Sequence, residues 1–402
     1  MTIRSRLTAL KSQAGALPAQ PATTEIPTLR NRLAHVRAER VQGLPTRSSQ
    51  RMSEAELASS IGGKLIGDGL IRIERTIHLS EPVGNTAFDG LRKPALLPGE
   101  TDPLPAVYLD TETTGLSGGS GTLAFLVGFA YVSGEEIKLT QLIITRFAAE
   151  SELLSLLQQL LPHGHRLVSY NGKSFDVPLL VSRFRMQGLR SEFADVEHLD
   201  LLHPVRRLFS KCWDDCRLTT AEKKLLGFQR TDDLPGAEAP EAWFSFLRAG
   251  DGRKLIKVIE HNRQDILSLT AIHNTIANAV TNPLQHGVDI HGLSRWVLES
   301  DEERALHLLR SHKENMCDDG KRLLAHLSRR SERWEEALPL WEDLANKGCV
   351  ESIERLAKYH EHISKNLETA LHYCDRLPGS TTDRHRRNRI LGKLSGASLA
   401  RF

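Results

Sequence analysis

Two carboxylates occupy an unusual place in the stretch "VYLDTETTGL". Asp110 and Glu112 come directly after the apolar residues Val107 to Leu109 and lie two positions apart. Side chains at i and i+2 of a strand share a face, so two like charges would lie together at the end of a buried strand. Such a pair is costly to bury unless a cation neutralises it.

Two further acids interrupt apolar segments. Asp176 lies in "YNGKSFDVPLL", at the start of a predicted helix that follows a buried strand. Asp265 lies in "HNRQDILSL" on a long predicted helix, and His261 is four residues earlier, on the same helical face. Taken singly, each has an ordinary explanation: Asp176 as a first-turn acid favoured by the helix dipole, and His261 with Asp265 as a surface pair.

If the four carboxylates converge, they predict a site for two divalent ions, Mg²⁺ or Mn²⁺, about 4 Å apart. Hard divalent ions prefer oxygen donors, and a pair of them stabilises the attacking and leaving oxygens of a phosphoryl displacement. Histidine titrates near neutral pH, so His261 is suited to take the proton of the attacking water.

Apolar patterning predicts the elements that must carry these residues. Strands are expected at 106–112, 123–132, 137–145, 166–170 and 198–202, and helices at 151–161, 175–188 and 253–280. The Ser133-Gly134 turn makes the first three strands an antiparallel meander. Alternating helices and strands then follow, so the pattern predicts an α/β fold with a mixed five-stranded sheet flanked by helices.

The remaining chain divides by composition. We predict a basic, disordered segment over 1–50, a small α/β lead-in over 51–104, the main domain over 105–282, an all-α region over 300–380 and a basic tail over 381–402. In the all-α region, Ala337-Leu338 and Ala370-Leu371 lie 33 residues apart. That spacing favours tetratricopeptide-like helical repeats, and an ordinary helical bundle with a chance echo is the alternative.

The three acidic stretches, in this order, resemble the Exo I, Exo II and Exo III motifs of the DnaQ-like 3′→5′ exonucleases. "YNGKSFDVPLL" is similar to the Exo II motif of B-family DNA polymerase proofreading domains. Residues 106–275 resemble the YprB-type ribonuclease-H-like family through "LDLLHPVRRL", "CRLTTAEKKLLG", "TDDLPG" and "HNRQDILSL" as well. The resemblance implies a ribonuclease-H-like fold, in which Asp110, Glu112, Asp176 and Asp265 match the metal-binding acids.

One motif departs from the superfamily pattern. Exo III is Tyr-x3-Asp or His-x4-Asp in its two main subclasses, whereas His261 lies four residues before Asp265, the tyrosine spacing with a histidine. The role of His261 as general base is therefore less secure than those of the four ligands. His273, two turns beyond Asp265, is expected to be a packing or surface residue.

Other residues are candidates for contacts with the substrate. The backbone amides of Thr113 and Thr114 could meet a terminal nucleotide, and Asn171 and Lys173 could contact phosphate, although a turn role for Asn171-Gly172 fits equally. The glycine-rich stretch 115–121 lacks the Gly-Lys-Ser/Thr ending of a P-loop and is read as a hairpin loop. Arg206 and Arg207 either line a substrate channel or are solvated.

Composition limits the location and the partners. The chain has 402 residues, a net charge of +3, 40% hydrophobic residues and five scattered cysteines, which suggests a globular protein of a reducing, cytoplasmic compartment. No apolar stretch is long enough to span a membrane. Basic residues cluster at both ends, and these ends suggest affinity for a polyanion.

The sequence therefore favours a metal-dependent 3′→5′ exonuclease acting on single-stranded or frayed DNA or RNA. A protein partner could bind the helical repeats. One alternative is a non-catalytic nucleic-acid or protein scaffold, and another is a structure-specific endonuclease that uses the same acids.

Overall fold

A computed structural model describes residues 51–399 of the chain, except residues 86, 87, 89, 90, 92–95, 101–103, 116–120 and 232, and the side chains of residues 396–399. The predicted disordered segment 1–50 lies outside the described residues. The predicted glycine-rich hairpin loop at 115–121 lies mostly outside them as well.

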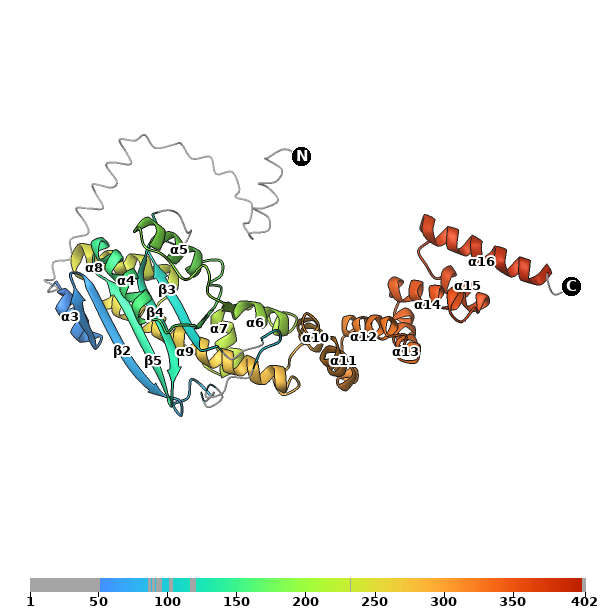
Figure 1. Ribbon diagram of the computed structural model, residues 1–402, viewed down its shortest axis with the longest axis horizontal. Helices are drawn as coiled ribbons and strands as arrows, with labels where there is room; N and C mark the ends of the chain where they lie inside the picture. Colours follow the sequence, from blue (N-terminus) through green and yellow to red (C-terminus); the bar gives the residue numbers. More distant parts are fainter. Residues whose placement is uncertain are drawn as a thin grey trace, which may run out of the picture. The chain divides into compact units, whose positions relative to one another are not determined.

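One mixed sheet of seven strands forms the centre of the fold (Figure 1). In spatial order the strands are β1 (Gly63–Gly67), β2 (Leu70–His78), β5 (Glu136–Ile144), β4 (Ala124–Ser133), β3 (Ala106–Thr113), β6 (Arg166–Ser169) and β7 (His198–Asp200). Pairing is antiparallel from β1 through β3 and parallel from β3 to β7. The α/β class and the antiparallel meander β3–β4–β5 are confirmed.

The predicted number of five strands is wrong, because two strands of the lead-in join the same sheet. β2 pairs with β5 along its whole length, from Leu70 opposite Ile144 to His78 opposite Glu136. The helix α3 (Glu54–Ser60) precedes this hairpin and begins with a capping box between Ser53 and Glu56. Long-range strand pairing leaves no trace in local periodicity, so the sequence pattern could not reveal it.

Helices pack against both faces of the sheet. The helices that follow β5 in the sequence are α4 (Glu150–Leu160), α5 (Asp176–Met186), α6 (Leu202–Phe209), α7 (Leu218–Ala221), the π-helix η3 (Glu222–Leu226), α8 (Ala239–Ala249) and α9 (Arg253–Thr281). Leu153 and Leu157 of α4 share one core with Val107 and Leu109 of β3. The next residue, Tyr108, belongs to a second core with residues of α6 and α9, as the alternation of a strand requires.

The long helix α9 approaches the sheet closely at Gly128 of β4, which is paired with Asp110 of β3. A Cβ atom at Gly128 would lie 2.2 Å from Asn262 Oδ1 and 2.3 Å from Ile266 Cδ1. Only glycine therefore lets this turn of α9 reach the strand that carries Asp110.

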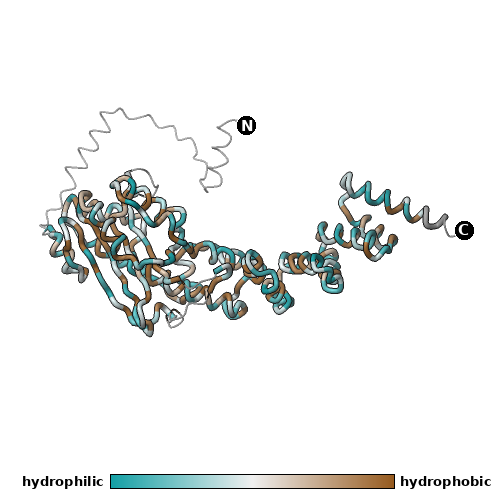
Figure 2. Tube along the Cα trace, viewed as in Figure 1, coloured by the Kyte–Doolittle hydropathy of each residue, from teal (hydrophilic) through white to brown (hydrophobic). Residues whose placement is uncertain are grey.

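The C-terminal region is entirely helical in its described part, as predicted. Its helices are α10 (Ile290–Leu298), α11 (Glu302–Ser311), α12 (Asp318–Arg330), α13 (Trp334–Asn346), α14 (Val350–His362), α15 (Leu367–Asp375) and α16 (Thr381–Leu399). Consecutive helices pack on one another, with Leu324, Trp341 and Leu356 in a common core. Hydrophobic and hydrophilic stretches alternate along these helices (Figure 2), and the tetratricopeptide-like repeat stays a prediction.

None of the helices in the described part of the chain is both long and apolar enough to cross a membrane. All five cysteines carry free thiols.

The close approach at Gly128 gives a first testable prediction. Replacing Gly128 with alanine forces Asn262 and Ile266 away from β4, and overpacking of this kind costs about 1–3 kcal/mol of unfolding free energy. Thermal or urea unfolding measures this loss of stability. Gly236→Ala is the matched control, because a Cβ atom there meets nothing within 4 Å; equal stability of the two variants would contradict the packing argument.

Candidate active site

The first two acids lie on the interior strand β3. Asp110 and Glu112 occupy β3 near its carboxyl end, and Glu112 is only 8% exposed. β3 runs parallel to β6, so the segment that follows β6 emerges at the same edge of the sheet. That segment carries Asp176, and the topology therefore brings three of the four acids to one edge.

Asp176 begins helix α5 and is held by β3. Its Oδ1 accepts hydrogen bonds from the Thr111 amide, at 3.2 Å, and from the Thr111 hydroxyl, at 2.5 Å. The preceding turn is tight: a Cβ atom on Gly172 would lie 2.3 Å from Ser169 Oγ and 3.1 Å from Asp176 Oδ2. Gly172 therefore allows the chain to turn sharply just before Asp176.

Helix α9 supplies the rest of the cluster. Asn262 Nδ2 donates to Asp110 Oδ2 at 2.8 Å and to the Asp110 carbonyl at 3.2 Å. His261 Nε2 lies 3.6 Å from Asp265 Oδ2 and 4.0 Å from Glu112 Oε1. The four-residue spacing that departs from the superfamily pattern thus still places the imidazole of His261 at the edge of the carboxylates.

Asp110 and Glu112 lie close enough to the other acids to be affected by their charges. Burial raises the pKa of Asp110 well above its usual value, and the neighbouring Asp265, Asp176 and Glu112 raise it further. Burial and the same type of repulsion raise the pKa of Glu112. Burial raises the pKa of Asp176 to about 6, although the Thr111 hydrogen bonds act in the opposite direction.

One cation of the chain already touches this cluster. The Arg230 guanidinium donates through Nη2 to Asp265, whose pKa is raised by burial and partly lowered by Arg230. Arg230 is also held by Glu222, a side chain of the π-helix η3, through hydrogen bonds of 2.8 and 2.5 Å. Glu222 is 1% exposed and receives another hydrogen bond from Ser268 of α9.

The donor set fits hard divalent cations. Asp110, Glu112, Asp176 and Asp265 offer only carboxylate oxygens, and burial together with mutual repulsion favours the arrival of positive charge. Arg230 neutralises part of the charge of Asp265 and partly offsets the rise in the pKa of Glu112.

Of the candidates for substrate contacts, Asn171 and Lys173 lie in the turn before Asp176. Their backbone amides donate to the two carboxylate oxygens of Asp200, at 2.7 and 3.1 Å. Asn171 has a φ of 66°, a left-handed conformation that asparagine tolerates better than most residues. Asp200, at the end of β7, therefore shapes this turn and leaves the Lys173 side chain exposed.

The two threonines after Glu112 are engaged within the hairpin. Thr114 donates its amide to the Leu123 carbonyl at 3.0 Å, and its hydroxyl accepts from the Leu123 amide at 3.1 Å. The Thr113 hydroxyl donates to the Gly115 carbonyl at 2.8 Å. The amide of Thr114 therefore closes the hairpin just beyond the ends of β3 and β4 and is not free to contact a substrate.

Two other predictions concerned residues near the acids. His273 is buried and bonds to the Tyr108 hydroxyl at 2.9 Å, and burial lowers its pKa to about 4, so it is a packing residue. Arg207 pairs with Glu299 at 2.7 Å and lies over the Trp296 ring, which makes it a link between α6 and α10.

Several residues of the site were not found from the sequence. In the sequence, Asn262 is not distinguished from the other polar residues of "HNRQD". Its contact with Asp110 depends on Gln141 of β5, which donates to the Asn262 Oδ1 at 2.8 Å. Arg230 and Asp233 lie in an irregular segment between η3 and α8, where periodicity gives no signal. A group of charges in the loop "QRTDDLPG" was the only indication of their role.

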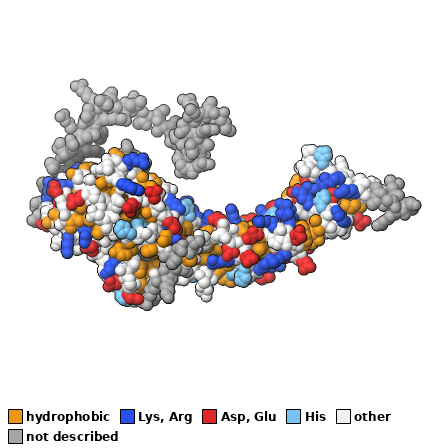
Figure 3. Space-filling view, viewed as in Figure 1, with side chains coloured by type: hydrophobic (Ala, Val, Ile, Leu, Met, Phe, Trp, Pro, Cys, Tyr) orange, Lys and Arg blue, Asp and Glu red, His pale blue; other side chains and the backbone are white. Residues whose placement is uncertain are grey.

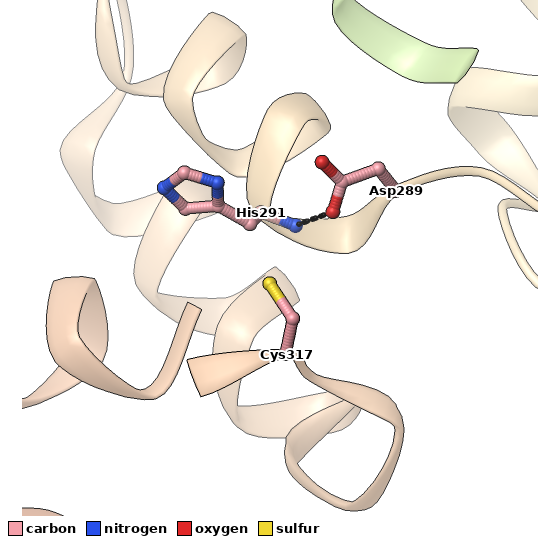
Figure 4. A group of neighbouring side chains, drawn as sticks. All are labelled: Asp289, His291 and Cys317. Atoms are coloured by element: carbon pink, nitrogen blue, oxygen red, sulfur yellow. Dashed lines mark hydrogen bonds between the residues drawn. The ribbon is translucent and has the colours of Figure 1, made fainter. Parts of the chain in front are cut away.

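Among the described residues, one group of three metal-binding side chains has its ligand atoms within 4.8 Å of one another, and it lies apart from these acids. It consists of Asp289, His291 and Cys317 (Figure 4). The Lys211 ammonium lies 3.2 Å from His291 Nδ1, 3.4 Å from Asp289 Oδ2 and 3.8 Å from Cys317 Sγ. The chain thus supplies its own cation here, and we assign no metal ion to this group.

Comparisons with known proteins identify the family of the chain. A family model described as the RNase_H superfamily matches residues 107–277. The protein YprB of Bacillus subtilis (strain 168) is 34% identical over 283 residues, which span 67% of this chain and 68% of that protein. The family B DNA polymerase of the hyperthermophilic archaeon Pyrobaculum calidifontis is 12% identical, with a TM-score of 0.34, over 60% of this chain and 35% of the polymerase. That last likeness is too low to indicate a shared activity. On its match to the Bacillus protein and to the superfamily model, the chain belongs to the YprB family and carries a domain of the RNase H superfamily.

Proposed function

We propose that this protein is a metal-dependent 3′→5′ exonuclease that hydrolyses phosphodiester bonds in single-stranded or frayed nucleic acid. The observation that carries the proposal is the meeting of four carboxylates and one histidine from β3, α5 and α9 at a single edge of the sheet. A buried group of like charges is costly for the fold, and a catalytic role that requires cations accounts for it.

Asp110, Glu112, Asp176 and Asp265 are the residues that would hold two Mg²⁺ or Mn²⁺ ions. When bound, such a pair of ions stabilises the charge on the attacking and leaving oxygens of a phosphoryl displacement. Asn262 and Thr111 orient two of the carboxylates, because each donates a hydrogen bond to one of their oxygens.

His261 is the proposed proton acceptor. Its Nε2 faces Glu112 and Asp265, and no other histidine among the described residues contacts the four acids. An imidazole at this place can accept a proton from a water molecule that attacks the scissile phosphate.

The turn before α5 is the proposed contact for the substrate. Lys173 is exposed and carries a positive charge that suits a phosphate of the backbone. Phe175 is 56% exposed directly before Asp176, and an exposed aromatic ring there can stack on a base. We also assign Asn171 and Thr113 to contacts with the substrate, whereas Thr114 stabilises the hairpin.

The C-terminal helices give less support to direct binding of nucleic acid. Basic and acidic side chains are interspersed there in the space-filling view (Figure 3). Arg386 pairs with Glu354, Arg387 with Asp375, and Arg389 with Glu361, so much of the positive charge of α16 is balanced within the protein. We therefore propose a protein partner rather than a polyanion for this region.

Cleavage of end-labelled polymers tests the proposal. With Mg²⁺ or Mn²⁺, the wild-type protein should shorten 5′-labelled single-stranded DNA or RNA from its 3′ end, and EDTA should stop the reaction. Asp110→Ala removes one of the proposed ligands and should lower the rate by on the order of a hundredfold or more, the scale on which the loss of an electrostatic stabiliser acts. The polymer that is degraded faster shows whether the preferred substrate is DNA or RNA.

The other outcomes of this assay separate the alternatives. A discrete internal cut that also needs Asp110 would indicate a structure-specific endonuclease. Binding of either polymer without any cleavage would indicate a scaffold.

The charge cluster makes a prediction about stability. In EDTA, Asp110→Asn removes one repelling charge while its amide oxygen can still accept from Asn262, so Tm should rise by about 2 °C or more. Mn²⁺ should raise the Tm of the wild type and have less effect on the variant, because ligands stabilise the state that binds them. Asp214→Asn, at an exposed position, is the control; a lower Tm for Asp110→Asn in EDTA would contradict the repulsion.

A further prediction concerns pH. Because the pKa of Asp176 is raised from 3.8 to about 6, the folded metal-free protein holds a proton there that the unfolded chain loses earlier. Its stability should therefore fall as pH rises through this window. Mn²⁺ must displace that proton, so calorimetry should find tighter binding at pH 7.5 than at pH 5.5, with protons released. Asp176→Asn should weaken the binding and flatten this dependence, and a pH-independent wild type would refute the assignment.

A further inference from the structure

The segment between η3 and α8 places a carboxylate behind the proposed base. Asp233 Oδ1 lies 2.7 Å from His261 Nδ1, on the side of the ring opposite to the acids. The other ring nitrogen, Nε2, lies 3.6 Å from Asp265 and 4.0 Å from Glu112. The imidazole is thus held between one carboxylate that contacts Nδ1 and the cluster that faces Nε2.

The contacts around Nδ1 allow one assignment of its proton. A carboxylate only accepts hydrogen bonds and a guanidinium only donates them. Arg230 Nη1 lies 3.1 Å from Nδ1 and also 3.2 Å from Asp233 Oδ2. If Arg230 donated to Nδ1, Asp233 Oδ1 would face a lone pair at 2.7 Å, which is repulsive. With Nδ1 protonated, Nδ1–H donates to Asp233 Oδ1 and Arg230 donates to Asp233 Oδ2.

Asp233 is itself fixed by buried groups. Arg230 holds it by an ion pair of 3.2 Å, and Arg230 is in turn held by Glu222 of the π-helix. Both Arg230 and Glu222 have side chains that are at most 9% exposed. The carboxylate therefore has a defined position although it belongs to an irregular segment.

We propose that Asp233 is a positioning residue that holds His261 as its Nδ1–H tautomer and directs the Nε2 lone pair toward the acid cluster. The inference rests on the proposed nuclease function. In the hydrolysis, the water oxygen bonds to phosphorus as the bond from phosphorus to the 3′ oxygen breaks. One water proton passes to Nε2, the 3′ oxygen takes a proton from solvent, and Asp233 stabilises the imidazolium that forms.

The tautomer can be observed without any activity. In protein labelled with ¹⁵N-histidine, His261→Asn identifies the resonances of His261, and the nitrogen shifts show which nitrogen carries the proton. At pH 7.5 with Mg²⁺, the wild type should show Nδ1–H, and Asp233→Ala should shift the population toward Nε2–H. A wild-type ring protonated at Nε2, alone or together with Nδ1, or an unchanged tautomer in the variant, would overturn the proposal.

Kinetics test whether the positioning matters for the reaction. Asp233→Ala should lower kcat by about 10–100-fold, the range for residues that orient a functional group, with KM and Mg²⁺ affinity nearly unchanged. In a His261→Ala background, Asp233→Ala should lower kcat no further, because the two residues act as one unit. Asp233→Asn should retain part of kcat, since its carbonyl can still accept from Nδ1–H.

Asp215→Ala is the matched control, because Asp215 also accepts two hydrogen bonds, from Arg217 and Thr220, in a loop with no recorded contact to the acids. Additive losses in the double variant would refute the positioning role while the exonuclease itself stands. If the wild type cleaves nothing, the proposed function fails, and the ¹⁵N measurement alone then decides whether Asp233 sets the tautomer.

Discussion

The repulsion among four carboxylates, of which Glu112 and Asp265 are buried and Asp110 and Asp176 half-buried, is the constraint on which the rest of this structure depends. The described protein groups balance it only in part, since Asp265 is the one acid of the four that Arg230 contacts, and Asn262 offers Asp110 a neutral hydrogen bond. A fold that keeps such a cluster must hold the acids from rigid elements, and here a strand and two helices do so. Under the proposed function, the cost to the metal-free protein is the same free energy that would favour the binding of cations.

The layers of the fold are arranged around this cluster. The parallel pairing of β3 with β6 and β7 brings the ends of three strands to one edge, where Asp110, Glu112 and Asp200 lie and the turn to Asp176 begins. Gly128 lets α9 descend on β4, so that one helix can place Asn262, His261 and Asp265 against β3. The π-helix η3 then positions Glu222, and through it Arg230, on the outer side of the cluster. Extra residues in a helix of this type commonly re-aim a side chain at a functional site.

Much of the candidate site could be proposed from the sequence because its acids interrupt the apolar pattern around them. Asp110, Asp176 and Asp265 each interrupt a segment that periodicity marks as buried, and the elements that carry them have nearly the expected bounds. Arg230 and Asp233 could not be found in this way, because an irregular segment has no periodicity for a charge to violate. The pairing of β2 with β5 could not be predicted for another reason: it joins residues 58 to 74 positions apart, and no local sequence pattern indicates such a contact.

That pairing has a consequence for the solution behaviour of the protein. β5 is a nine-residue strand whose side chains are buried almost throughout, and as an outer strand it would present a long row of unpaired amides and carbonyls. β2 satisfies these groups, and the sheet ends instead on β1, a five-residue strand with an irregular register whose exposed side chains are Lys64, Leu65 and Ile66. Short and irregular outer strands are poorer templates for another chain than long, regular ones. The lead-in thus protects the protein against edge-to-edge aggregation.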